Sequence, residues 1–371
     1  MKRQTTPLGR LLSIPIGLDY SWFLVFVLMT WALAASYYPA AFANWSAALD
    51  WVMGAVTTIM LFVSVVLHEL GHAVIARRYR IPVRRITLFL FGGVAEIGAE
   101  PPSAGAEFWI AIAGPIVSFA LAVLFSVLQP LVAGIAPLLA LASYLASING
   151  ALALFNLIPG FPLDGGRVFR AIVWGITHNL RRATLIAANL GRVIAYLFIV
   201  AGVWQVLDGN LGGLWIAFIG WFLESAAATQ VAQQQIHDLL AGHHVAEAMN
   251  RDYTAIPNDM TLQQLVNQYV LERGQRCFVV EHAGTATGLL TLHHIKAVPR
   301  SAWPTTTAAQ AMLPAEQFKS TSPDAELWAA LEEMDQDGVN QLPVLADHRV
   351  LGMLSRDSVI GFLRTARELG A

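Results

Sequence analysis

The stretch LFVSVVLHELGHAVIARRYR, residues 61–80, decides how this chain folds. Its first part belongs to an apolar run from Met53 to Ala76, and a helix needs ~20 mainly apolar residues to cross a bilayer. The motif HELGH, residues 68–72, stands inside this run, and arginines follow the run directly. The stretch therefore predicts a membrane helix that carries a polar cluster near one end.

The composition divides the chain into two parts. Of its 371 residues, 56% are hydrophobic and 13% are charged, whereas soluble globular domains carry about 25% charged residues. The deficit lies before the last ~130 residues, which read like a soluble domain. We therefore predict a transmembrane domain over residues 1–232, a linker over 233–244 and a folded module after it. The net charge of −2 gives no broad basic surface for nucleic acid.

Five further runs match the first in length and composition. The six predicted spans are Tyr20–Pro39, Met53–Ala76, Phe108–Leu128, Ala136–Leu157, Leu185–Leu207 and Leu211–Ala232. The links after the second and fourth spans are rich in Arg, while the other three links contain no Lys or Arg. Because Lys and Arg collect on the cytoplasmic side, we predict a multi-pass protein of the cell membrane whose termini and C-terminal module are cytoplasmic.

A short β-sheet is predicted directly after the second span. Residues 81–97, IPVRRITLFLFGGVAEI, are too few to cross a membrane as a helix and are rich in β-branched and aromatic residues. Gly92 and Gly93 predict a turn or kink within this segment. Because open backbone at membrane depth requires surrounding protein or a water-filled cavity, we expect the sheet at the mouth of a cavity.

The HELGH motif is typical of a metal site. His68 and His72 are four residues apart, so their imidazoles lie on one face of a helix and can reach a single metal. Glu69 stands beside His68 and can hold a metal-bound water. Ionisable residues inside a membrane are costly and usually functional, although a polar cluster that packs helices together is the alternative.

A catalytic zinc takes three protein ligands and leaves one position open, so a third ligand must come from elsewhere. The candidates in the membrane half are Glu96, Glu100, Glu107, Asp164 and His178. Asp164 is favoured because the second and fourth spans both run toward the cytoplasm, and because the surrounding Pro and Gly residues would end the helix and aim the carboxylate. A helix cap or an ion pair with Arg167 is the alternative role for Asp164.

The tail contains an internal repeat. Gly288-Leu-Leu-Thr291 matches Gly352-Met-Leu-Ser355 after 64 residues, and Ala246-Glu-Ala-Met249 resembles Ala309-Gln-Ala-Met312. Each copy is predicted to run helix, strand, helix, strand, strand, helix, over residues 245–304 and 305–371. The single cysteine, Cys277, lies in an apolar strand and is predicted to be a buried structural thiol.

Two motifs together carry a resemblance that covers essentially the whole chain, HELGH at 68–72 and NLIPGFPLDGG at 156–166. The chain resembles the site-2 protease family of intramembrane metalloproteases, in the subgroup with six spans and a C-terminal pair of cystathionine-β-synthase-type (CBS) domains. The resemblance implies one Zn²⁺ per chain, held by His68, His72 and Asp164, with Glu69 as catalytic base. It implies a zinc-dependent endopeptidase that cleaves transmembrane protein substrates in regulated intramembrane proteolysis.

The same resemblance implies where the substrate lies. Gly92 and Gly93, with Phe91, would belong to a strand that pairs with an unwound substrate. Asn149 and Asn156 match positions near the substrate or the active site, where an amide can donate a hydrogen bond to the developing oxyanion. Membrane lipid would surround this domain.

The CBS resemblance leaves two roles open for the tail. CBS pairs often bind adenine nucleotides through a Gly-x-x-Thr/Ser-x-x-Asp pattern, but His294 and Ser358 stand here where Asp is expected, and Asp357 comes one position early. The tail therefore either senses a ligand or serves as a rigid module for gating or dimerisation. Pairing of two such tails predicts a homodimer.

Two other functions stay open for the whole chain. A CBS-regulated membrane transporter or channel predicts charges along a pathway and a repeat that relates two membrane halves, whereas here the charges cluster in one motif and no such repeat is visible. An inactive relative acting as a membrane chaperone predicts a damaged motif, whereas HELGH and Asp164 are intact. Glu224, in the sixth span, is predicted to lie near the interface or to bond a neighbouring helix.

Overall fold

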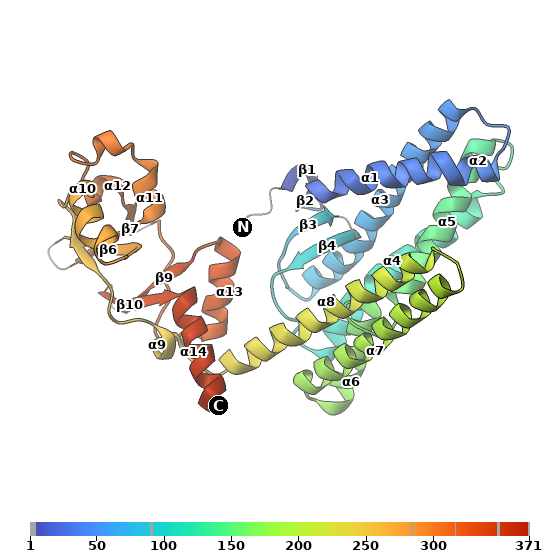
Figure 1. The fold of residues 1–371 in the computed structure, drawn as a ribbon. Helices are drawn as coiled ribbons and strands as arrows, with labels where there is room; N and C mark the ends of the chain where they lie inside the picture. Colours follow the sequence, from blue (N-terminus) through green and yellow to red (C-terminus); the bar gives the residue numbers. More distant parts are fainter. Residues whose placement is uncertain (1–4, 90–91, 283–284, 316, 347–348, 370–371) are drawn as a thin grey trace. The chain divides into compact units, whose positions relative to one another are not determined.

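The computed structural model describes residues 5–89, 92–282, 285–315, 317–346 and 349–369 (Figure 1). The chain divides into two compact units, one ending at Gln234 and the other beginning at Gln235. We call them the membrane unit and the tail unit. Phe91, which the sequence placed next to the substrate, lies outside the described residues.

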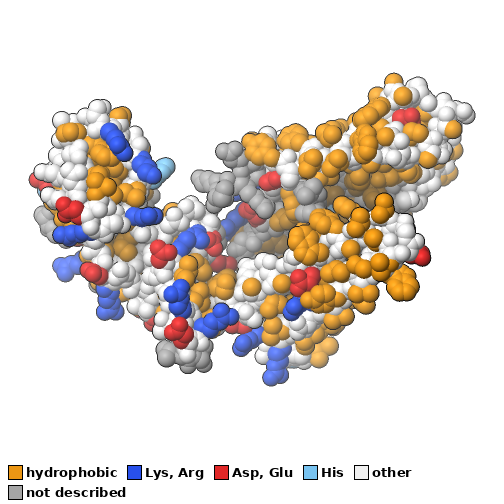
Figure 2. Space-filling model, viewed as in Figure 1, with side chains coloured by type: hydrophobic (Ala, Val, Ile, Leu, Met, Phe, Trp, Pro, Cys, Tyr) orange, Lys and Arg blue, Asp and Glu red, His pale blue; other side chains and the backbone are white. Residues whose placement is uncertain are grey.

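Within its described residues, the membrane unit contains six helices long and apolar enough to cross a membrane, as predicted. The first span combines α1 (Tyr20–Ala32), a π-helical turn η1 (Leu33–Tyr37) and α2 (Tyr38–Ala41), and the others are α3 (Ala47–Arg78), α4 (Ala104–Leu128), α5 (Ala136–Asn156), α7 (Leu180–Leu207) and α8 (Gly213–Leu240). Hydrophobic side chains cover much of the face of these helices that Figure 2 shows. Such a surface suits lipid rather than water.

Most of the spans are longer than the apolar runs predict. Ser46 caps α3, since its hydroxyl accepts a hydrogen bond from the Leu49 N–H, and Asn179 caps α7 in the same way. Helix α8 continues to Leu240, through most of the linker predicted over residues 233–244. An apolar run marks the part of a helix that lies in lipid, whereas caps mark where the helix begins and ends.

A four-stranded sheet with the order β1-β2-β3-β4 lies beside α3 (Figure 1). Its strands are β1 (Thr5–Leu11), β2 (Ile14–Asp19), β3 (Val83–Phe89) and β4 (Gly92–Ile97), with β2 and β3 parallel and the other pairs antiparallel. The sequence predicted only β3 and β4. Pro7 and Gly9 obscured β1, because both residue types are rare in strands. Ile14 and Ile86 pack against Ala73, which fixes the sheet on α3.

A short helix, α6 (Asp164–Thr177), follows α5 and was not predicted. Its first turn contains Gly165 and Gly166, which are poor helix formers. Both positions require glycine, because a Cβ on Gly165 would lie 2.3 Å from the carbonyl oxygen of Leu157. The α5–α6 loop thus folds tightly onto the start of α6.

One ion pair joins the last two spans. Glu224 of α8 lies 3.4 Å from Arg192 of α7, measured between Oε1 and Nε. This contact agrees with the prediction that Glu224 bonds a neighbouring helix. A paired carboxylate is the usual form in which an acid is tolerated at membrane depth.

The tail unit contains two copies of one motif, in the predicted order of elements. The first copy contains α9 (Val245–Ala248), β5 (Ala255–Pro257), α10 (Leu262–Leu265) with the π-turn η2 (Val266–Leu271), β6 (Cys277–His282), β7 (Thr285–Thr291) and α11 (Leu292–Ala297). A 3₁₀ turn η3 (Arg300–Ala302) follows. The second copy contains α12 (Ala308–Ala311), β8 (Leu313–Pro314), α13 (Leu327–Asp337), β9 (Gln341–Ala346), β10 (Arg349–Ser355) and α14 (Arg356–Leu369).

The two copies interlock through the repeated glycines. Strand β8 of the second copy pairs with β7 of the first, and Asn250 of the first copy pairs with Met353 of the second. At Gly288 a Cβ would lie 2.8 Å from the Leu313 carbonyl oxygen, and at Gly352 a Cβ would lie 2.7 Å from the Asn250 carbonyl oxygen. Each copy therefore has a glycine at the place where the backbone of the other copy approaches it closely.

Cys277 lies at the start of β6 and is half-buried rather than fully buried. Burial raises the pKa of its thiol to about 12. The thiol is therefore protonated at neutral pH, which agrees with a structural role.

Candidate metal centre

The two histidines of HELGH lie side by side on α3. Both are buried, with 4% of each residue exposed, and their Nε2 atoms are 3.2 Å apart. One helical turn separates them, so the rigid backbone of α3 holds the two rings in register. The sequence predicted this arrangement from the spacing alone.

Asp164 completes a cluster of three possible metal ligands. It is the first residue of α6, and its Oδ2 lies 3.1 Å from Nε2 of His68 and 3.2 Å from Nε2 of His72. A tetrahedral zinc with nitrogen and oxygen ligands at 2.0–2.1 Å requires ligand atoms about 3.3 Å apart. The three mutual distances therefore fit a single Zn²⁺ with an open fourth position.

The carboxylate of Asp164 is suited to bind a cation. Burial disfavours its charge, but His72 and His68 outweigh burial and lower the pKa of Asp164 well below its ordinary value. The group is therefore ionised at neutral pH, which is the state that coordinates zinc.

Helix α4 orients both imidazoles. Nδ1 of His72 lies 2.7 Å from the carbonyl oxygen of Ile110, and Nδ1 of His68 lies 2.8 Å from Oγ of Ser118. A carbonyl only accepts, so Nδ1 of His72 carries the proton and Nε2 keeps its lone pair for a metal. Partners of this kind fix the tautomer and the ring orientation of metal-binding histidines.

Gly114 makes room for the cluster. A Cβ at this position would lie 2.2 Å from Nε2 of His72 and 2.6 Å from Nε2 of His68. Only glycine therefore lets α4 approach the metal-binding face of α3 this closely. Gly114 was not predicted from the sequence, although the Gly114-Pro115 pair inside an apolar span is a signal that marks the position.

Glu69 points toward the sheet. Its Oε2 accepts a hydrogen bond of 3.1 Å from the backbone N–H of Ala95 in β4, and a Cβ on Gly93 would lie 2.6 Å from its Cγ. The bare backbone at Gly93 thus lets the edge strand lie directly against the carboxylate. Gly92 begins β4 with φ of 129°, which agrees with the predicted kink.

A buried ion pair fixes α6 on α4. Glu107 is fully buried in the first turn of α4, and its Oε1 accepts hydrogen bonds from Nε of Arg170, at 2.6 Å, and from Nη2 of the same side chain. Nε of Arg167 lies 4.0 Å from the same oxygen. Because Asp164 begins α6, this pair also positions Asp164. This role of Glu107 and Arg170 was not predicted from the sequence.

The other candidates for the third ligand lie away from the two histidines. Glu107 is bound to Arg170, Glu96 pairs with Arg85 at 3.2 Å, and Glu100 is exposed. His178 ends α6 in a left-handed conformation, more than three helical turns along from Asp164. Within the described residues, these side chains take no part in the three-ligand cluster.

The two predicted asparagines differ in their surroundings. Asn149 is fully buried in α5, where its amide donates to Oγ of Ser64, at 3.2 Å, and to the carbonyl oxygen of Leu145, at 2.8 Å. It therefore links α5 to α3 about one turn before His68. Asn156 is the last residue of α5 and is partly exposed.

The chain is similar to known proteins in both of its units. The chain matches Peptidase family M50 over residues 56–136 and 131–200, and the CBS domain over residues 245–301 and 304–365. It is 38% identical to a Mycobacterium tuberculosis protein named as zinc metalloprotease Rip3, over 90% of this chain and 86% of that one. It is 34% identical to a Synechocystis protein named as zinc metalloprotease sll0528, over 96% of this chain and 95% of that one.

A solved site-2 protease from Methanocaldococcus jannaschii is 32% identical and covers 61% of this chain and 95% of its own, with a TM-score of 0.44. The two sequence relatives align along nearly the full length of both chains. This multi-pass membrane protein belongs to Peptidase family M50, the site-2 protease family of zinc metalloproteases, and carries a pair of CBS domains.

Proposed function

We propose that the chain is an intramembrane zinc endopeptidase that cleaves transmembrane protein substrates. The observation that carries this proposal is the spacing of Nε2 of His68, Nε2 of His72 and Oδ2 of Asp164, which are 3.1–3.2 Å apart. Glu69 directly follows His68 on the same helix. One Zn²⁺ per chain would be held by these three atoms. The transmembrane domain would span residues 1–232, with CBS domains over 245–304 and 305–371.

The chain's own residues would guide the reaction as follows. Bound zinc would supply an acidified water and polarise the scissile carbonyl. Glu69 takes a proton from the attacking water and later passes it to the leaving amine. The Ala95 N–H holds the Glu69 carboxylate at its place beside the metal ligands. The apolar helices around the site keep bulk water away and so strengthen these electrostatic contacts.

Strand β4 is the proposed docking place for the substrate. It is one of the two edge strands of the sheet within the described residues, and the Ala95 N–H donates to Glu69. An unwound substrate would pair with this edge near Gly92 and Gly93. Asn156, partly exposed at the end of α5, would contact the substrate. Asn149 would act on it only through the contact between α5 and α3.

The tail unit is proposed to regulate the peptidase or to join two copies as a homodimer. A cleft of about 740 Å³ lies between its two copies, lined by Thr291, His294, Ser355 and Asp357 among others. The hydroxyls and the carboxylate are groups that a nucleotide ribose could bond. Binding of AMP to the purified chain, measured by calorimetry, tests this role. The arginines that follow α3 and α5 support a cytoplasmic place for the termini and the tail.

The decisive experiment compares the wild type with Glu69→Gln in detergent. Zinc content and cleavage of a transmembrane substrate are measured on the same samples. We expect about one zinc in both proteins and cleavage by the wild type alone, because Glu69 is not a ligand. A wild type without zinc, or a variant that cleaves as well, would contradict the proposal and favour a transporter.

A further inference from the structure

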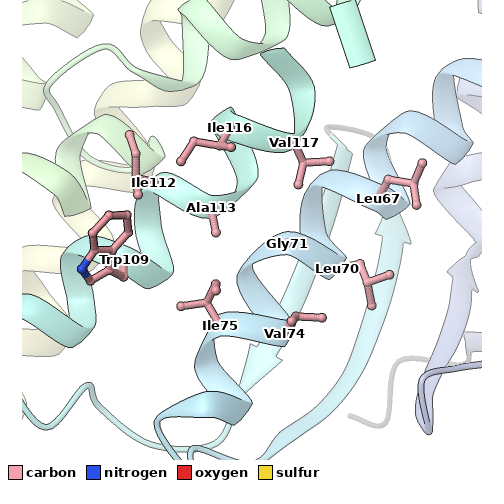
Figure 3. Close-up of a pocket in the computed structure, with 10 residues that line it drawn as sticks. All are labelled: Leu67, Leu70, Gly71, Val74, Ile75, Trp109, Ile112, Ala113, Ile116 and Val117. Carbon is pink, nitrogen blue, oxygen red and sulfur yellow. The ribbon is translucent and has the colours of Figure 1, made fainter. Parts of the chain in front are cut away.

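An apolar groove of about 490 Å³ runs between α3 and α4 (Figure 3). Leu67 and Val74 of α3 form one wall, and Trp109, Ile112 and Ile116 of α4 form the other. The groove is open toward the outside of the helices, since 44% of Val74, 54% of Trp109 and 51% of Ile116 is exposed. Its size lies within the ~300–1,000 Å³ of ligand pockets.

The floor of the groove is Gly71. A Cβ on Gly71 would lie 3.0 Å from the Ala113 carbonyl oxygen and 2.9 Å from Cγ2 of Val117, so the two helices touch there. The larger side chains of Val74, Trp109 and Ile116 lie around this contact and line the groove (Figure 3). Gly71 directly precedes His72, so whatever fills the groove rests against the metal-binding turn.

A basic residue follows the groove residues along α3. Leu67, Gly71, Val74 and Arg78 follow each other at spacings of four, three and four residues, which places them on one face of α3. Arg78 lies in the last turn, about 6 Å along the axis from Val74. It is exposed and has no ion-pair partner among the described residues. The face is thus apolar along the span and cationic where the span ends.

We propose that this groove holds an acyl chain of an anionic phospholipid whose phosphate pairs with Arg78. The apolar walls match an acyl chain, and the guanidinium at the end of the span matches the phosphate of a headgroup. A substrate helix fits less well, because Glu69 lies two residues from both Leu67 and Gly71 and therefore points to the opposite side of α3. The proposal does not depend on peptidase activity.

The first test uses native mass spectrometry on the full-length protein. It is titrated with palmitoyl-oleoyl phosphatidylglycerol or with phosphatidylcholine that carries the same chains. Ile116→Trp fills the groove from α4, and Val74→Trp fills it from α3. Leu197→Trp is the matched control, since Leu197 is 63% exposed on α7 and lies outside the groove. Equal zinc content in all samples shows that the variants fold.

The wild type and Leu197→Trp are expected to retain phosphatidylglycerol, while both groove variants lose at least one bound lipid. Arg78→Gln is expected to weaken the affinity for phosphatidylglycerol about fivefold and to leave the affinity for phosphatidylcholine unchanged. The fivefold change corresponds to the contribution of one basic residue at an anionic membrane surface. Groove variants that bind lipid like the control would overturn the proposal. If the groove variants retain lipid but lose a dimer mass, the groove is a contact between two copies of the chain. If they retain lipid but lose crosslinking to a substrate, the groove binds the substrate. An unchanged headgroup preference in Arg78→Gln would remove Arg78 from the site.

Discussion

The metal centre depends on one residue without a side chain, Gly114. Gly114→Ala would place a Cβ 2.2 Å from Nε2 of His72, so one histidine must turn away from the metal. We expect zinc affinity to fall by more than about tenfold, as when the orientation of a ligand is disturbed. The measurement is zinc retained after competition with a chelator.

The matched control for this change is Gly150→Ala. Gly150 lies in α5 of the same unit, and a Cβ there would meet nothing nearer than Cβ of Ala122, at 3.9 Å. This variant should keep its zinc. Equal zinc retention by the two alanine variants would show that Gly114 does not shape the centre.

A second residue-scale prediction concerns Ser118. Ser118→Ala removes the hydroxyl that is hydrogen-bonded to Nδ1 of His68, which frees the ring to rotate and to change tautomer. Loss of such a partner typically costs about 10–100-fold in metal affinity. Ser126→Ala is the control on the same helix, because among the described residues the Ser126 hydroxyl donates only to the Ala122 carbonyl oxygen. If chelator competition gives the same zinc affinity for both variants, the hydrogen bond has no part in orienting His68.

At the scale of elements, the placement of α6 rests on a buried ion pair. Glu107→Gln leaves Arg170 buried without its counter-charge, and breaking a buried pair costs about 3–5 kcal/mol. We expect a lower melting temperature in detergent together with weaker zinc binding, because Asp164 moves with α6. Glu96→Gln is the control, since its pair with Arg85 is nearly half exposed and such pairs contribute about 0–1 kcal/mol. A Glu107→Gln variant as stable as the control would contradict this role.

Most of the helices and the three possible metal ligands could be predicted from the sequence. Six spans followed from apolar runs, and His68, His72 and Asp164 followed from motif spacing and helix direction. Strand β1 could not be predicted, because its Pro and Gly mimic a loop, and α6 is short and begins with two glycines. Ser118 and Gly114 lie more than 40 residues from HELGH along the chain, so their roles exist only once α4 packs against α3.

At the scale of the whole molecule, the division into two compact units predicts that damage to one spares the other. Gly352→Ala places a Cβ 2.7 Å from the Asn250 carbonyl oxygen, and overpacking of this kind costs about 1–3 kcal/mol. We expect faster proteolysis of the tail unit at unchanged zinc content. Gly361→Ala is the control, because a Cβ there meets nothing within 4 Å. Zinc loss in Gly352→Ala would show that the metal centre depends on the tail.

The hydrogen bond between Glu69 and β4 has a consequence for how this chain can vary. Its donor is the backbone N–H of residue 95, so every replacement of Ala95 except proline retains the donor. The same holds for the Ile110 carbonyl oxygen that orients His72, which all residue types possess. The residues at positions 95 and 110 can therefore be substituted during evolution while both hydrogen bonds are retained. Two supports of the centre are thus carried by the shape of the main chain, where a comparison of sequences alone would not detect them.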